Sequence, residues 1–170
     1  MKLVIRLPVN RWQEGEGTLL GDDGNELGRW PCRGKADNGK AAANGNPPAG
    51  EPSQRDPRKP FGDTPAGAWQ GCRAVIRPRH EPGDHIGPTW IPLPHERAAD
   101  DATRELLDPA RQGCREDLGI HAGRGDGELI ATNGCVRMRD RDFARLVELV
   151  GEKKFGVEIQ DIESTEMSKI

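Results

Sequence analysis

The chain has 170 residues, a formal net charge of −3 at neutral pH and a hydrophobic content of 34%. This length suits one domain with its own core and is short for two. Basic and acidic residues are interleaved, and no apolar run approaches the roughly 18 residues of a membrane helix, so we expect neither nucleic acid nor a membrane among the partners.

The first 31 residues predict three strands. Residues 2–9 alternate apolar and polar side chains, which is typical of a strand. Residues 17–20 and 26–31 read as a hairpin, because Gly21-Asp22-Asp23-Gly24-Asn25 between them has the composition of a tight turn. Met1–Asn10 lacks the continuous apolar stretch and the cleavage site of a secretory signal peptide.

Residues 35–60 contain five prolines and no Val, Ile, Leu, Met, Phe or Trp. Such a segment cannot bury enough apolar surface to offset the entropy lost on ordering. It predicts a disordered or surface-loop insertion inside a single domain that spans residues 1–163. The last residues, 164–170, are predicted to be a frayed tail.

The second half of the chain predicts further strands and two helices. Strands are expected at 64–69 and 72–77, an extended segment at 90–94, a helix at 98–111 limited by Pro109, and a closing strand at 155–159. A second helix is expected from Arg141 to Gly151, with Asp140 as its cap and with an apolar face formed by Phe143, Leu146, Val147 and Val150.

A polar stretch between the strands contains several metal-ligating residue types, His80, Glu81, Asp84, His85 and His95. These residues lie among prolines and include no pair of histidines at helical spacing. We interpret the stretch as a polar loop and expect no metal and no cofactor.

His121 and Cys135 are the candidate catalytic pair. Leu118–His121 predicts a strand, Asp126-Gly127 a tight turn, and Glu128–Ala131 a returning strand that leads to the cysteine. A hairpin of this kind would bring an imidazole beside a thiol, which is the minimum for nucleophilic catalysis by sulfur. We therefore expect Cys135 to be the most acidic thiol of the chain. The alternative is that Cys135 is a buried apolar residue.

Gly134 precedes the nucleophile and lets the backbone turn sharply there. The backbone N–H groups of this turn are candidates for an oxyanion hole.

The three other cysteines are Cys32, Cys72 and Cys114. An odd number of thiols cannot all pair within one chain, so at most two of these three are expected to form a disulfide, and only after export.

Two motifs, found in the expected order, resemble the catalytic domain of the YkuD-type L,D-transpeptidases. Six residues match the family signature Ser/Thr-His-Gly-Cys-Ile/Val-Arg-Leu/Met: Thr132, Gly134, Cys135, Val136, Arg137 and Met138. Upstream, Asp63–Trp69 resembles the Thr-Pro-x-Gly-x-Phe element of that family. Asn133 stands where the family usually has His, and Ala122 where it usually has Gly. The resemblance extends over residues 17–160 and leaves the irregular insertion unmatched.

The resemblance implies a mostly β fold, an L,D-transpeptidase-like β-sandwich of mixed strands with one or two covering helices. It also implies acyl transfer on peptidoglycan stem peptides, as an L,D-transpeptidase or L,D-carboxypeptidase that releases the terminal D-alanine through a Cys135 thioester. His121 would be the base and the backbone carbonyl of Ala122 its orienting group. Thr132, Asn133 and Arg137 would contact the substrate. The acyl acceptor stays open between water, a D-amino acid and a second stem peptide.

Such a substrate lies in the periplasm or cell wall, whereas residues 1–10 carry no export signal. We expect a monomer that is made in the cytoplasm and exported by a leaderless route, unless a leader has been removed. One alternative is that the same chemistry serves an antibacterial toxin, such as a type VI secretion effector with an inhibitor or immunity protein as its partner. Another is a non-catalytic module that binds the cell wall.

Overall fold

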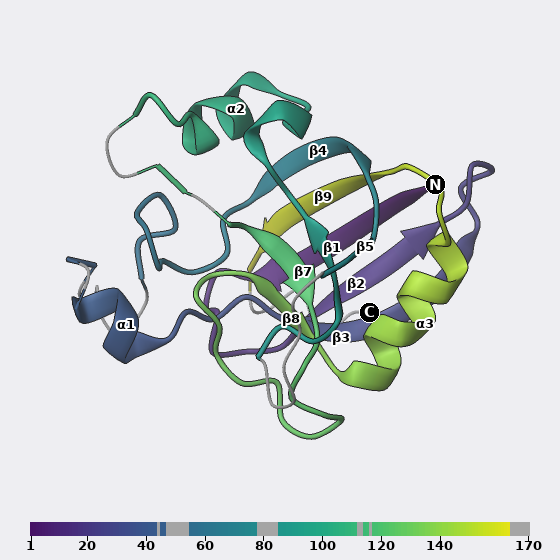
Figure 1. Ribbon diagram of the computed structural model, residues 1–170, viewed down its shortest axis with the longest axis horizontal. Helices are drawn as coiled ribbons and strands as arrows, with labels where there is room; N and C mark the ends of the chain where they lie inside the picture. The colour runs from purple at the N-terminus through teal and green to yellow at the C-terminus, as the bar shows by residue number, and fades with distance from the viewer. Residues whose placement is uncertain (44, 47–54, 78–84, 112–113, 116, 164–170) are drawn as a thin grey trace.

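A computed structural model describes residues 1–43, 45–46, 55–77, 85–111, 114–115 and 117–163. The strands of this part of the chain form one sheet in the order β4-β9-β1-β2-β3-β8-β7-β6-β5 (Figure 1). The strands are β1 (Lys2–Pro8), β2 (Gly15–Leu20), β3 (Glu26–Arg33), β4 (Gly67–Cys72), β5 (Val75–Ile76), β6 (Thr89–Pro92), β7 (Gly119–His121), β8 (Val136–Met138) and β9 (Phe155–Ile162). The helices are α1 (Asn38–Ala43), the 3-10 helix η1 (His95–Arg97), α2 (Asp101–Leu107) and α3 (Asp140–Val150).

The sheet contains strands of both directions. β1 pairs antiparallel with β2 and parallel with β9. β7 and β8 are also parallel, and the other neighbours are antiparallel. The predicted N-terminal strand, the hairpin after it and the closing strand are all confirmed, although β9 continues three residues beyond the predicted end at Ile159.

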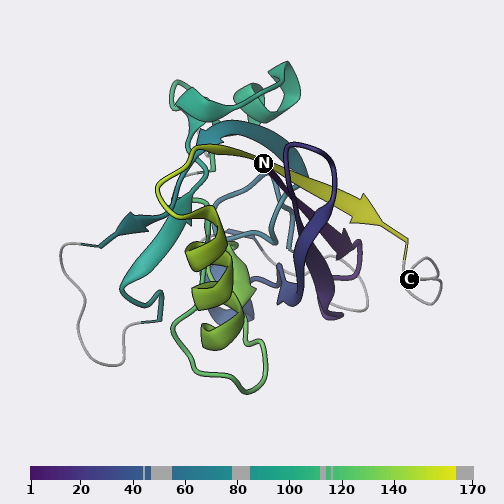
Figure 2. The ribbon, with the colours of Figure 1, turned by 90° about the vertical axis from the view of Figure 1, so that its right-hand side faces the viewer.

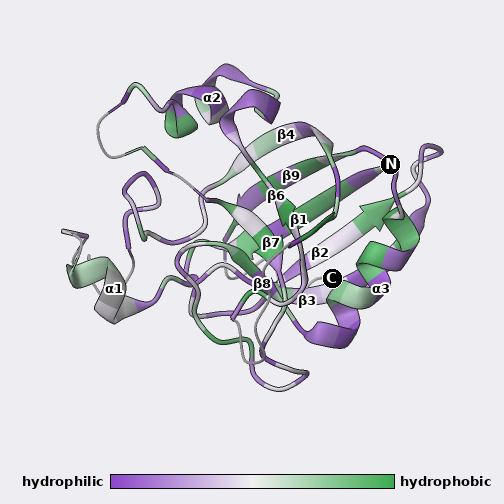
Figure 3. Ribbon diagram, viewed as in Figure 1, coloured by the Kyte–Doolittle hydropathy of each residue, from purple (hydrophilic) through white to green (hydrophobic). Residues whose placement is uncertain are grey.

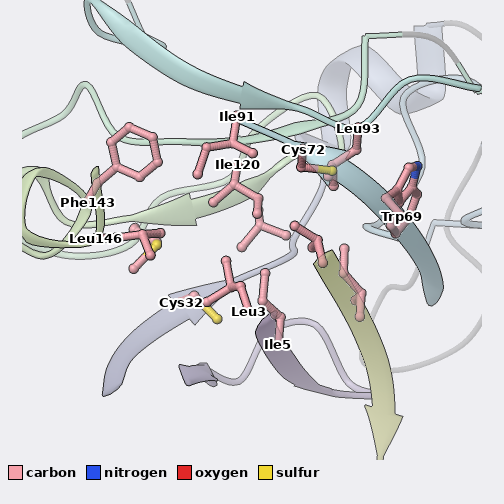
Figure 4. Close-up of a cluster of buried hydrophobic side chains, with 14 of the residues drawn as sticks. Leu3, Ile5, Cys32, Trp69, Cys72, Ile91, Leu93, Ile120, Phe143 and Leu146 are labelled. Carbon is pink, nitrogen blue, oxygen red and sulfur yellow. The ribbon is translucent and has the colours of Figure 1, made fainter. Parts of the chain in front are cut away.

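The core lies inside the curl of this sheet (Figure 2). Leu3 and Ile5 of β1 face Ile91 of β6 and Ile120 of β7 across it, and all four are at most 1% exposed (Figure 4). Hydrophobic residues accordingly gather on central strands such as β1 (Figure 3). The β-rich class is therefore confirmed, and the strands belong to one continuous curled sheet rather than to two separate ones.

α3 closes the core with a single apolar face. Phe143, Leu146 and Val150 are buried and recur at spacings of three and four residues, as an amphipathic helix requires. The predicted helix is confirmed to within one residue at each end. Asp140 does not cap it: Arg139 occupies the cap position, and the Asp140 carboxylate instead accepts the backbone N–H groups of Gly123 and Arg124. α2, beside β4, is shorter than the predicted helix at 98–111.

The predicted hairpin between His121 and Cys135 is wrong. Residues 128–131 form no strand, and β8 lies parallel to β7 with Ile120 opposite Val136. Parallel neighbours require a crossover connection, which the long loop 122–135 provides. Within that loop Leu129 is buried, and its carbonyl accepts a hydrogen bond from Arg33 Nη1 at 2.7 Å instead of pairing with a strand.

The described parts of segment 35–60 are packed rather than disordered. Ala36, Ala41, Asn46 and Arg55 are buried there, at 0 to 4% exposure. The Asn46 side chain bonds both the N–H and the carbonyl of Asp56, at 3.1 and 3.0 Å. Buried small residues and side-chain hydrogen bonds thus hold the segment in place, although it has no large apolar side chains. Residues 44 and 47–54, like the predicted frayed tail 164–170, lie outside the described residues.

Ala41→Asp should lower the free energy of unfolding by on the order of 2 kcal/mol, because it places an unpaired charge in a fully buried position. Ala42→Asp is the matched control, since residue 42 is exposed on the same short helix. Urea unfolding of the two variants measures the difference. Equal stabilities would contradict the packing of α1 against the domain.

Candidate active site

The parallel register of β7 and β8 places the predicted catalytic pair at one cavity. His121 lies opposite Arg137, while Ile120 and Val136 form the neighbouring pair and point into the core. Side chains alternate between the two faces of a sheet, so His121 and Arg137 lie on the opposite face from that pair. His121, Arg137 and Cys135 all line a cavity of about 1000 Å³. The two catalytic candidates therefore come together although the predicted hairpin does not exist.

The carbonyl of Ala122 fixes the orientation of the His121 ring. His121 is 2% exposed, and its Nδ1 lies 2.9 Å from Ala122 O. A carbonyl can only accept, so this contact assigns a proton to Nδ1. Arg137 Nη1 donates to the same oxygen at 2.8 Å. This geometry is the one expected for Ala122 as an orienting group, and it adds Arg137 as a second donor to it.

The Cys135 thiol is buried and protonated at neutral pH. It is 7% exposed, and Sγ lies 3.3 Å from the carbonyl of Asp117. Burial raises the pKa of Cys135 to about 11, against the opposing effects of the Gly119 N–H and of the charges of Arg115 and Arg137. Burial raises the pKa of Cys72 to about 11 as well. Desolvation thus outweighs the nearby positive charges at Cys135, and the greater acidity of this thiol stays a prediction.

The turn before the nucleophile is held by a threonine hydroxyl. Thr132 Oγ1 accepts the Gly134 N–H at 3.0 Å and donates to the carbonyl of Cys135 at 2.8 Å. The hydroxyl of Thr132 is thus committed to the turn rather than to a substrate, and the Gly134 N–H is not available as an oxyanion donor. The N–H of Cys135 itself has no acceptor among the described residues and is the better candidate for that role.

Gly134 is required at its position for two reasons. Its φ of 106° lies in the region that favours glycine. A Cβ there would also overlap Arg115 Nη2 and the carbonyl oxygen of Gly62. The role of Gly134 is therefore to let the nucleophile turn approach these two groups closely.

Arg115 is a site residue that the sequence analysis missed. It is 3% exposed and donates from Nη1 to the carbonyls of Lys59 and Gly62, at 2.7 and 2.9 Å. Its Nη2 donates to the carbonyl of Gly134 at 3.3 Å. Burial lowers the pKa of Arg115 to about 10, so the group keeps its charge at neutral pH. The surrounding run of charged residues resembles a solvated connector, and local sequence does not distinguish a buried arginine from an exposed one.

The upstream motif touches the cysteine turn directly. Thr64 Oγ1 donates to the carbonyl of Gly134 at 2.9 Å. The carboxylate of Asp63 accepts the backbone N–H groups of Ala36 and Arg55, at 2.8 and 3.0 Å, which fixes the segment that presents Thr64. The two motifs that are far apart in sequence therefore form one hydrogen-bonded unit.

Asn133 and Arg137 occupy different positions in the cavity. Asn133 is exposed and lines it. Arg137 is 2% exposed, and burial, together with the charge of Arg124, lowers its pKa to about 10.

All four cysteines, Cys32, Cys72, Cys114 and Cys135, are free thiols and are buried.

No group of three or more potential metal ligands gathers among the described residues, and His80, Glu81 and Asp84 of the predicted polar loop lie outside them. None of the helices described is long and apolar enough to cross a membrane.

No protein-family model matches the sequence, and no curated protein matches it either. Two solved structures resemble the fold. Bd1075 from Bdellovibrio bacteriovorus is 13% identical, with a TM-score of 0.54 over 98% of this chain and 52% of that one. The helical cell shape determining protein Pgp2 from Campylobacter jejuni is 16% identical, with a TM-score of 0.50 over 95% of this chain and 48% of that one. The chain thus shares a fold with about half the length of each.

Alkylation of Cys135 should become about tenfold faster per pH unit between pH 7 and pH 10, because only the thiolate reacts and the thiol pKa is raised to about 11. Peptide-resolved mass spectrometry after iodoacetamide treatment measures this rate separately from that of Cys114, which lines the same cavity. A rate that is already constant between pH 6 and pH 8 would show a preformed thiolate and contradict the buried, protonated thiol.

Arg115→Met should lower the free energy of unfolding by about 3 kcal/mol, because the buried carbonyls of Lys59, Gly62 and Gly134 lose their charged donor. It should also slow alkylation of Cys135, since a positive charge that favours the thiolate is removed. Arg111→Met is the control, because Arg111 lines the same cavity but is exposed. Equal effects of the two substitutions would refute a specific role for Arg115.

Proposed function

We propose that the protein is a cysteine-dependent acyl transferase of the L,D-transpeptidase or L,D-carboxypeptidase kind that acts on peptidoglycan stem peptides. The observation that carries the proposal is the placement of Cys135 and His121 at one cavity, with the His121 ring oriented by the Ala122 carbonyl. A thiol and an oriented imidazole are the parts that acyl transfer through a thioester requires. The matching motif around Cys135 supplies the substrate class.

Burial raises the pKa of the Cys135 thiol, which favours general-base activation over a resting ion pair. At neutral pH a thiol whose pKa is about 11 contributes almost no thiolate. His121 Nε2 therefore takes the Sγ proton as Sγ bonds to the substrate carbonyl carbon, in the manner of the histidine of a serine hydrolase. The carbonyl oxygen gains the negative charge, and the N–H of Cys135 is the donor that we propose for it.

The second half of the reaction uses the same groups in reverse. The tetrahedral intermediate breaks its C–N bond, and the protonated His121 gives its proton to the departing amine. A thioester on Cys135 remains. His121 then deprotonates the acceptor, which is water or an amine, as it attacks the thioester carbon, and the proton returns to Sγ when the C–S bond breaks. Each step moves one proton through Nε2, so the Nδ1 contact with Ala122 persists throughout.

The comparison with known structures supports this proposal at the level of fold. Pgp2 is described as a helical cell shape determining protein, which is compatible with a place in cell-wall chemistry. Its identity of 16% carries no residue-level assignment. The use of the same chemistry as a toxin and the non-catalytic wall-binding module stay hypotheses.

The test is incubation of the protein with purified muropeptides, followed by mass spectrometry of both products and protein. We expect loss of the terminal D-alanine from tetrapeptides and a mass increase on the tryptic peptide that contains Cys135. Cys135→Ala and His121→Ala should abolish both signals. Cys114→Ala is the matched control, because Cys114 is a buried thiol at the same cavity, and it should retain them. Turnover by Cys135→Ala, or no product from the parent protein, would refute the proposal.

A further inference from the structure

Unfavourable backbone conformations gather at the cavity. Two residues other than glycine have a positive φ among those that the structure describes, Phe61 at 58° and Asp117 at 51°. Both line the cavity that contains Cys135 and His121. A left-handed backbone is costly for a residue with a Cβ, and it persists only where the surrounding structure imposes it. Asp117 also hydrogen-bonds the nucleophile, so its conformation bears directly on the site.

The conformation of Asp117 is imposed by its neighbours. On one side, the buried Arg115 is held by the carbonyl of Gly134 and by two further carbonyls. On the other side, Leu118 is 3% exposed, and its carbonyl accepts the N–H of Leu93 at 2.9 Å. The Asp117 side chain itself is exposed, so its own packing does not account for the positive φ. The two anchors therefore determine where the carbonyl of Asp117 points.

This carbonyl is one of two backbone groups that hold the sulfur of Cys135. Asp117 O accepts the thiol proton from Sγ at 3.3 Å, and the N–H of Gly119 donates to the same sulfur. Cys135 directly precedes the first residue of β8, and Gly119 is the first residue of β7. A thiol is both a weak donor and a weak acceptor, so it can satisfy the two backbone groups at once. The direction of Sγ is thereby fixed at two points.

The two contacts have opposite effects on the protonation of the thiol. A carbonyl oxygen stabilises the S–H form and repels a thiolate, whereas an N–H group favours the thiolate. Burial is the main cause that raises the pKa of Cys135, and the negative charge of Asp117 adds to it, against the charges of Arg115 and Arg137. A protonated thiol reacts slowly with oxidants and with electrophiles. The carbonyl of Asp117 therefore preserves the nucleophile between turnovers.

We propose that Asp117 is a positioning residue whose left-handed backbone aims its carbonyl at the Cys135 thiol and keeps the proton on sulfur until an acyl donor binds. Its role in catalysis rests on the proposed function, whereas the contact can be tested in the protein alone. As Sγ bonds to the substrate carbonyl carbon, its S–H bond breaks, the proton passes to His121 Nε2, and the hydrogen bond to Asp117 is lost. When the C–S bond breaks at the end of the cycle, Sγ regains a proton and the contact forms again.

The test begins with the infrared S–H stretching band of each thiol, because a hydrogen bond to an acceptor lowers the frequency of this band. Difference spectra between the parent protein and Cys135→Ala, and between the parent and Cys72→Ala, isolate the two bands. Cys72 is the reference, since it is also buried but donates to no acceptor among the described residues. We expect the Cys135 band at the lower frequency.

Three substitutions of Asp117 then separate its carbonyl from its charge. Asp117→Asn and Asp117→Gly remove the charge, and both residues adopt a positive φ readily. Asp117→Pro also removes the charge, but the ring fixes φ at about −65° and turns the carbonyl away from Sγ. We expect the first two variants to keep the Cys135 band of the parent protein. Asp117→Pro should raise its frequency and make alkylation of Cys135 at pH 8 about fivefold faster than in Asp117→Asn, the factor that corresponds to one ordinary hydrogen bond.

Alkylation of Cys72 shows whether each variant is folded, because unfolding exposes this thiol as well. With Cys72 still protected, an equal Cys135 band and an equal rate in Asp117→Pro and Asp117→Asn would overturn the inference. Coincident bands of Cys135 and Cys72 in the parent protein would overturn it without any variant, and this comparison decides alone if Asp117→Pro unfolds. Neither measurement uses a substrate. A failure to process muropeptides would therefore refute the proposed function and leave the result on Asp117 intact.

Discussion

The parallel pairing of β7 with β8 determines which side chains meet at the cavity. This register places Ile120 and Val136 together in the core, and it leaves His121 and Arg137 side by side on the opposite face. A shift of one residue would exchange the two faces and place His121 and Arg137 in the apolar core. The apolar pair therefore specifies the position of the polar one. The core packing sets which residues are neighbours, and the hydrogen bonds of His121 and Arg137 to the Ala122 carbonyl then fix the orientation of the two side chains.

The irregular segments contain few large apolar side chains, and hydrogen bonds from buried arginines to their backbone carbonyls hold them in place. Arg11 donates to the carbonyls of Thr64, Leu7 and Pro8, and Arg115 donates to those of Lys59, Gly62 and Gly134. A guanidinium offers five donors in a fixed plane, so one side chain can hold several loop carbonyls that no strand pairs. The carbonyl acceptors around Arg11 and Arg115 offset the cost of removing these two guanidinium groups from water. Loops without large apolar residues thereby become rigid enough to present a nucleophile.

The sequence predicted the regular elements well and the irregular ones poorly. The apolar side chains of residues 2–9 and the spacing of Phe143, Leu146 and Val150 are local signals, and the corresponding strand and helix formed as expected. The packing of Ala41 and Asn46 and the burial of Arg115 depend on partners distant in sequence, which leave no local pattern. The hairpin prediction failed because Asp126-Gly127 is a good turn sequence in any loop, whichever way the next strand runs. His121 and Cys135 nevertheless line one cavity, because the strand register rather than the turn places them there.

The position of β9 has a consequence for folding during synthesis. β9 lies between β1 and β4, and its partner β1 precedes every other described strand in the sequence. β1 and β9 can therefore pair only after all the other described strands have been made. Pairings between such distant segments form slowly, because a long loop must close first. Until then β1 has an open edge, and the growing chain carries an unpaired row of backbone groups that other chains can bind. The interval between the synthesis of β1 and that of β9 is thus the period in which this sheet most needs protection from association.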